Sequence, residues 1–68
     1  MYRLPVQSSN IKSVGFDSNI LEIEFHSGGI YQYFDVPTDV YHLFMNTPSK
    51  GKFFDQFIKK IYRYQKVG

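Results

Sequence analysis

A run at Ile20–His26 limits the folds open to this chain, because apolar residues alternate there with glutamate or histidine. Alternation with period two is typical of a β-strand that has one buried face and one face in water. The run is followed by Ser27-Gly28-Gly29, and paired glycines adopt the backbone conformations of a tight hairpin turn without steric cost. We therefore expect the chain to turn back here and to form a second strand at Ile30–Asp35.

A third strand is expected before these two, at Ile11–Phe16, and the turn-like residues 17–19 separate it from the alternating run. Strict alternation within this strand would place Ile11 and Val14 on opposite faces. The three strands predict an antiparallel meander with one apolar face, which needs a cover to be stable. Residues 1–7 show no period, so they are expected to form an extended or loose lead-in.

The second half of the chain supplies two helices for that cover. Thr38–Asn46 begins after a proline and carries apolar residues at helical spacing, and a wider apolar stripe predicts a second helix at about residues 50–61. On the second helix Asp55 and Lys59 are four residues apart and are expected to pair. Residues 62–67 alternate in character and fit either an extension of this helix or a fourth, edge strand.

These elements predict an α+β fold in which a three-stranded antiparallel meander is followed by two helices packed on one face. The chain has 68 residues, enough for a single small domain with a core at about residues 8–66. Seven Phe and six Tyr provide the apolar surface that offsets the entropy of ordering so short a chain.

Charge is distributed unevenly along the chain. Residues 1–48 carry two basic and five acidic side chains, whereas residues 49–68 carry six basic side chains and one acidic. This asymmetry is typical of a basic face on an acidic body. A solvated helix that keeps a small domain in solution has the same pattern, so the charge alone does not identify a binding surface.

Several classes of function are excluded or disfavoured by what the sequence lacks. There is no cysteine, so disulfides and thiolate metal sites are excluded, and no apolar run has the length of a membrane span or the character of a signal peptide. Neither His26 nor His42 pairs with an acidic residue at metal-ligand spacing, and residues 49–52 lack the spacing of a P-loop. We expect a non-catalytic cytoplasmic protein with no cofactor, no metal ion and no membrane association.

Several short patterns occur in an order that resembles one small family. They are Ser8-Ser9-Asn10-Ile11, Val14-Gly15-Phe16-Asp17, Leu21 to Phe25, Gly29-Ile30-Tyr31-Gln32-Tyr33, Val36-Pro37, Ser49-Lys50-Gly51-Lys52-Phe53-Phe54, and finally Ile58 and Tyr62. Over about residues 7–66 the chain is similar to the KTSC domain, which is found at the C-terminus of some lysyl-tRNA synthetases and as a stand-alone bacterial protein. The resemblance places the central Y-x-Y motif at Tyr31 and Tyr33, and the synthetase context implies RNA as a partner.

The aromatic residues also suggest how RNA would be bound, because single strands are held by stacking bases on rings while cations follow the phosphates. Tyr31 and Tyr33 share one strand face, where they form either a platform for adjacent bases or the inner face of the sheet beneath the helices. Tyr62 and Tyr64 form a second candidate platform, or they pack against the edge of the sheet.

The phosphate contacts are predicted in the basic segment. The candidate side chains are Lys59, Lys60 and Arg63, together with Ser49, Lys50, Gly51 and Lys52 at the start of the second helix. Free N–H groups and the helix dipole favour an anion at a helix N-terminus. The alternative interpretation is that Ser49 caps the helix, Gly51 meets a packing or backbone need, and the lysines are simply solvated.

The leading hypothesis from sequence is a non-catalytic RNA-binding module for tRNA or single-stranded RNA. The rival hypothesis is a protein-interaction or assembly module, including a homo-oligomer, with no affinity for nucleic acid. The rival rests on the excess of aromatic residues and on the expected exposure of Ile30 and Phe34 if the neighbouring tyrosines face inward.

Overall fold

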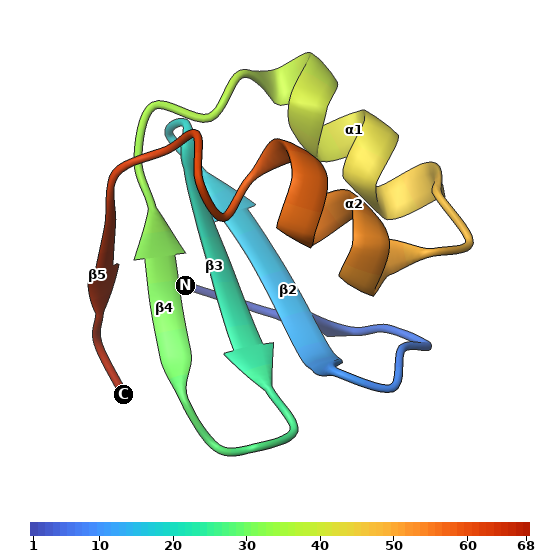
Figure 1. The fold of residues 1–68 in the computed structure, drawn as a ribbon. Helices are drawn as coiled ribbons and strands as arrows, with labels where there is room; N and C mark the ends of the chain where they lie inside the picture. The colour runs from blue at the N-terminus through green and yellow to red at the C-terminus, as the bar shows by residue number, and fades with distance from the viewer.

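Two helices cover one face of a five-stranded antiparallel sheet in the computed structural model, which describes all 68 residues (Figure 1). The elements in chain order are β1 (Leu4–Pro5), β2 (Ile11–Asp17), β3 (Ile20–Phe25), β4 (Ile30–Tyr33), α1 (Thr38–Asn46), α2 (Lys50–Phe57) and β5 (Tyr64–Lys66). The strands follow one another across the sheet in sequence order. The expected α+β class is therefore confirmed, with five strands in place of three. Neither helix has the length and hydrophobicity of a membrane span.

The first additional strand, β1, lies in the segment for which the sequence predicts a loose lead-in. Leu4 pairs with Val14 of β2, so these residues are part of the sheet. The close approach depends on Gly15, because a Cβ atom there would lie 2.6 Å from the carbonyl oxygen of Tyr2. The missing side chain of a strand glycine thus admits the N-terminal segment.

The second additional strand, β5, decides between the two alternatives for residues 62–67. Tyr64 pairs with Tyr33, which places this segment as an edge strand beside β4. Helix α2 ends at Phe57 instead of continuing to residue 61, and the buried Ile58 takes a non-helical conformation. The chain leaves the helix there because it must cross to the edge of the sheet.

The early end of α2 also overturns one expected ion pair. Asp55 and Lys59 would face each other on a continuous helix, but Lys59 lies beyond the last helical residue. The ion pairs of the structure join Arg3 to Glu22 and Glu24, and Arg63 to Asp35. Asp55 and Lys59 are therefore left unpaired.

The core lies between the helix-facing side of the sheet and the helices. Its nine buried apolar residues are Ile11, Val14, Leu21, Ile23, Tyr33, Val36, Phe44, Phe54 and Ile58. The register of β2 shifts between Ile11 and Ser13, which inserts one residue. This irregularity brings Ile11 and Val14 to the same face, whereas strict alternation would separate them.

The opposite face of the sheet carries a polar network that the alternation of β3 predicts to be in water. Glu22 is only 6% exposed, because Arg3 lies over it and forms an ion pair with its carboxylate. Gln32 donates a hydrogen bond of 2.8 Å to the same carboxylate, and the Arg3 Nε donates to the Ser13 hydroxyl at 3.1 Å. Ser13 in turn donates to Glu24 at 2.8 Å. We call this set the outer-face network.

The outer-face network sets the ionisation of its buried carboxyl. Burial alone raises the pKa of Glu22, but the hydrogen bonds from Gln32 and Arg3 and the positive charge of Arg3 outweigh burial. The pKa of Glu22 therefore lies below its ordinary value, and the carboxylate stays charged. The network fastens the N-terminal segment to the sheet.

Candidate nucleic-acid interface

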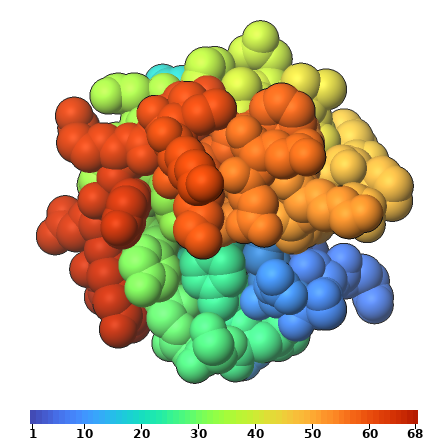
Figure 2. Space-filling view, viewed as in Figure 1, coloured from blue at the N-terminus to red at the C-terminus, as the bar shows by residue number.

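An open hollow of about 460 Å³ lies between α2 and the edge of the sheet formed by β4 and β5. Five aromatic residues line it, and we call it the aromatic hollow: Phe25, Tyr31, Tyr33, Phe54 and Tyr64. In Figure 2 the side chains of α2 and the turn after it (orange) lie above those of β3 and β4 (green), and β5 (red) lies to their left. The hollow has the size of a small-ligand site.

Strand pairing brings these rings together. Tyr33 lies opposite Tyr64 in the β4–β5 pair, and their ring centroids are 5.7 Å apart. Tyr31 lies two residues before Tyr33 on β4, and its ring centroid is 6.0 Å from that of Tyr64 and 5.7 Å from that of Phe25. Phe54 of α2 closes the inner end against Tyr33 at 5.4 Å. The rings form one connected cluster that runs from the core to the surface.

The Y-x-Y pair faces the helices, as the inward-facing alternative predicts, but its two rings have different surroundings. Tyr33 is 4% exposed, and burial, followed by the proximity of Tyr31 and Tyr64, raises its pKa to about 12. Tyr31 is only half-buried, and Tyr64 is 57% exposed. Tyr31 and Tyr64 therefore present ring surface to a ligand, whereas Tyr33 supports them from the core.

A second, polar hollow of about 320 Å³ lies at the start of α2. Its lining contains no aromatic or large aliphatic side chain and consists of Ser8, Ser9, Asn10, Pro48, Ser49, Lys50, Gly51, Lys52 and Asp55. Asn10, Gly51 and Asp55 also line the aromatic hollow, so the two hollows meet at these three residues. We refer to the two together as the groove.

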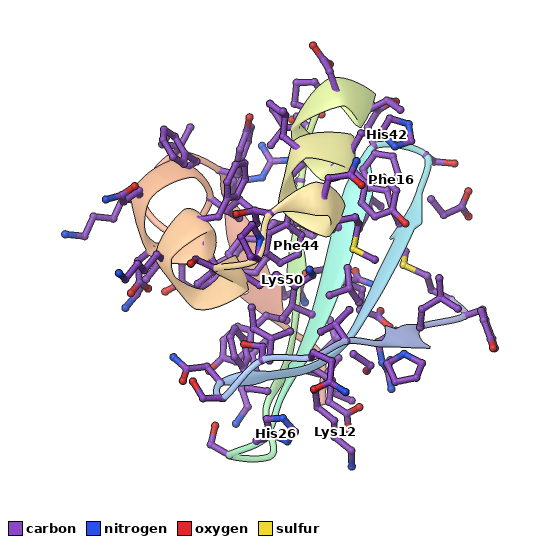
Figure 3. All side chains as sticks on the ribbon, turned by 90° about the vertical axis from the view of Figure 1, so that its right-hand side faces the viewer. Lys12, Phe16, His26, His42, Phe44 and Lys50 are labelled. Atoms are coloured by element: carbon purple, nitrogen blue, oxygen red, sulfur yellow. The ribbon has the colours of Figure 1, made fainter.

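The start of α2 lacks the side-chain cap that the alternative interpretation assigns to Ser49. Ser49 stands at the N-cap position but makes no side-chain hydrogen bond to the helix. The Lys50 ammonium donates a hydrogen bond to the carbonyl of Thr47 at 3.0 Å, and Figure 3 shows Lys50 where the chain passes from α1 into α2. The first-turn N–H groups of a helix have no partner within the helix. The polar hollow therefore combines donors with positive charge.

Gly51 lies where the two hollows meet. Its φ is not positive, and a Cβ atom there would lie 3.6 Å from the Asn10 side-chain nitrogen, an ordinary contact distance. Neither backbone geometry nor packing therefore requires glycine at this position. Gly51 therefore contributes only backbone to the surface that the two hollows share.

Four of the five predicted basic residues line the groove. Lys50 and Lys52 line the polar hollow, and Lys59 and Lys60 line the aromatic hollow. Arg63 does not join them, because its guanidinium lies 5.2 Å from the centroid of the Phe34 ring and 3.7 Å from the Asp35 carboxylate. The structure thus gathers the lysines at one groove and directs the arginine elsewhere.

Several lining residues were not singled out for binding by the sequence, among them Asn10, Phe25, Phe54 and Asp55. Phe25 is the last apolar residue of the alternating run and Phe54 belongs to the apolar stripe, so both carry a signal for burial. Asn10 carries only a turn signal, because its place in the groove depends on the packing of α2 against the start of β2. Only the tertiary structure brings these four together.

The two histidines lie at opposite ends of the molecule, His42 on α1 and His26 after β3 (Figure 3). No group of three or more His, Asp or Glu side chains is arranged to hold a metal ion. The aromatic hollow is larger than any other hollow in the surface, and two lysines are among its lining residues.

Comparison with known proteins identifies the family. Residues 7–64 match the family model of the KTSC domain. A protein from Stutzerimonas stutzeri is 40% identical over 70 residues, which cover 98% of this chain and 99% of that protein. A lysine–tRNA ligase from Trichormus variabilis is 39% identical over 66 residues, which cover 94% of this chain but 12% of the ligase.

A solved structure shows the same fold. The crystal structure of a KTSC domain protein from Yersinia pestis has a TM-score of 0.94 and 46% sequence identity to this chain, with 98% of this chain and 97% of that chain covered. Sequence and fold agree over nearly the whole length. The chain belongs to the KTSC domain family.

Proposed function

We propose that this domain is a non-catalytic module that binds single-stranded RNA in the groove. Bases stack on Tyr31 and Tyr64, and phosphates lie near the four groove lysines: Lys50, Lys52, Lys59 and Lys60. The observation that carries the proposal is that exposed ring surface and lysines line two adjacent hollows that share three residues. Proteins that bind single strands combine these two features.

The geometry favours a single strand over a duplex. The rings of the aromatic hollow lie between α2 and the edge of the sheet, so a base reaches them only after leaving its stack. Bases in loops and at strand ends are already unstacked. The related lysine–tRNA ligases make tRNA the first natural RNA to test, and the cytoplasm is the compartment that follows from this proposal.

The salt dependence of binding tests the proposal. Four lysines that each neutralise one phosphate should give a slope of roughly −3 in a plot of log affinity against log salt, at about −0.7 per phosphate on a single strand. Fluorescence anisotropy with labelled oligonucleotides and with tRNA, at several salt concentrations, measures this slope. Absence of binding even at low salt would overturn the proposal.

The rival function, a protein-interaction or assembly module, has a different structural basis from the one expected. Ile30 is half-buried beside the chain end at Gly68, and Phe34 is half-buried beneath Arg63. Exposed apolar side chains are instead found elsewhere, among them Leu43 on α1, Phe57 at the end of α2, and Ile61. An oligomer in analytical ultracentrifugation that is dissociated by Phe57→Glu, with no RNA affinity, would favour this function.

A further inference from the structure

Asp55 is an anomaly in a groove that would bind phosphates. It is the one carboxylate among the lining residues, it borders both hollows, and no ion pair neutralises it. A negative charge at this place repels the backbone of a nucleic acid. An exposed carboxylate here therefore weakens any binding that depends on charge alone. Its role in binding RNA would have to come from contact with a base and not with a phosphate.

A carboxylate only accepts hydrogen bonds, so it favours a base edge that presents N–H donors. The Watson–Crick edge of guanine presents two neighbouring donors, N1–H and the 2-amino group, at a spacing that two carboxylate oxygens match. Adenine and cytosine each present one amino group beside an acceptor nitrogen, and uracil presents one N–H between two carbonyls. Guanine is therefore the base that Asp55 favours most.

Asn10 supplies the donor that the carboxylate lacks. Its side-chain oxygen accepts a hydrogen bond of 3.1 Å from the Ser9 hydroxyl, and its side-chain nitrogen lies on the side of Gly51. The free amide N–H groups are donors, and guanine carries the acceptor O6 next to N1–H. Asn10 and Asp55, which both line the two hollows, thus supply the donor and the acceptor that the guanine edge needs.

We propose that Asp55, assisted by Asn10, makes the groove selective for guanine in single-stranded RNA. The inference rests on the proposed function and specifies its base preference. The guanine ring lies in the aromatic hollow against Tyr64 and Tyr31, and its Watson–Crick edge points to the place where the two hollows meet. Single-stranded RNA is read in this way in general, by stacking together with hydrogen bonds to the Watson–Crick edge.

The test compares RNA probes that differ in one base with protein variants that differ in one carboxylate, and it measures the affinity of each pair. The probes are three labelled oligouridylates of equal length with one central guanosine, inosine or adenosine; inosine differs from guanosine only by the missing 2-amino group. The proteins are the wild type, Asp55→Asn and Asp39→Asn. Asp39 is an exposed residue of α1 that lines neither hollow. Each variant loses one carboxylate, so the two have the same net charge and differ only in where the charge is removed.

We expect the wild type and Asp39→Asn to bind the guanosine probe about tenfold more tightly than the inosine probe, as one bidentate pair allows. Asp55→Asn should bind the two probes within about twofold of each other. Circular dichroism of the two variants verifies that both are folded, which the exposure of both positions predicts.

The outcomes separate the two proposals. No binding of any probe at low salt by the wild type overturns RNA binding, and guanine selection with it. Binding of all three probes with equal affinity overturns guanine selection alone. Equal tightening of all three probes by Asp55→Asn shows that the carboxylate acts only by repulsion, and it also overturns guanine selection.

Discussion

The two faces of the sheet use similar side chains in opposite ways. On the outer face, the carboxylates of Glu22 and Glu24 and the guanidinium of Arg3 are joined by ion pairs and hydrogen bonds within the chain. In the groove, Asp55 and three exposed lysines have no partner in the chain. Paired charge on the first face stabilises the fold, and unpaired charge on the second is available to a ligand.

Substitutions on the outer face should therefore change the stability of the domain and leave RNA binding intact. Arg3→Ala should lower the free energy of unfolding by about 2 kcal/mol, because it leaves the buried Glu22 carboxylate without its main partner. Urea denaturation measures this change. A matched Arg63→Ala, which removes a largely exposed guanidinium, should cost less than half as much. Equal effects of the two substitutions would contradict the assigned role of the outer-face network.

Substitutions in the groove should weaken RNA binding and leave the stability of the domain nearly unchanged. Tyr64→Ala should weaken binding of a single-stranded oligonucleotide about tenfold, within the roughly 1–3 kcal/mol that stacking of one base contributes. Its effect on stability should be small, because the ring is more than half exposed. Tyr2→Ala is the control, since Tyr2 is an exposed tyrosine outside the groove. Anisotropy titrations of the two variants should therefore differ, and equal affinities would argue against stacking on Tyr64.

The pH dependence of stability sharpens the contribution of the outer face. The pKa of Glu22 in the folded state lies below its ordinary value of 4.5, so its contribution is fully present above that pH. It is lost as the pH falls below 4.5 and through the folded-state pKa, because the unfolded chain takes up the proton more readily. Denaturation of the wild type and of Glu22→Gln at pH 7, 5, 4 and 3 measures this. The stability difference between them should shrink towards acid, and a constant difference would contradict this assignment.

The smallest expected effect is at Gly51, where stability and binding should change in opposite directions. Gly51→Ala should raise the free energy of unfolding by about 0.5 to 1 kcal/mol, the gain in helix propensity, since the added methyl meets Asn10 at an ordinary distance. The same methyl adds bulk to the surface that the two hollows share, so RNA affinity should fall severalfold. Denaturation and anisotropy measure the two effects, and a variant with raised affinity would show that added bulk at this surface does not obstruct RNA.

The parts of the fold that the sequence predicts well are those fixed by local pattern. Strand β3, the hairpin into β4 and helix α1 follow from alternation, paired glycines and helical spacing. The bounds of α1 agree with the structure, whereas β3 ends one residue and β4 two residues earlier than expected. Strand β1 and the end of α2 are missed because each depends on a distant partner. The N-terminal segment needs Gly15 and the outer-face network, and the chain after Phe57 needs the free edge of β4.

The groove residues that could be predicted are likewise those that local sequence brings together. Lys50, Gly51 and Lys52 are neighbours in sequence, so their gathering at one hollow could be predicted. Tyr31 and Tyr64 meet only because β5 pairs with β4, and sequence leaves that pairing open. Alternation places Tyr31 and Tyr33 on a common face but does not say which of them the helices bury. Arg63 carries the same charge as the lysines, and its contact with Phe34 depends on the path of the chain into β5.

The edge position of β5 gives the groove one firm wall and one yielding wall. This strand has three residues, all exposed, and a single neighbouring strand, whereas Phe54 on the opposite wall is anchored in the core. Such an edge frays independently of the rest of the sheet. An occupant seated against Tyr64 would hold the fraying edge closed, so hydrogen–deuterium exchange would slow in β5 while the central strands kept their rates.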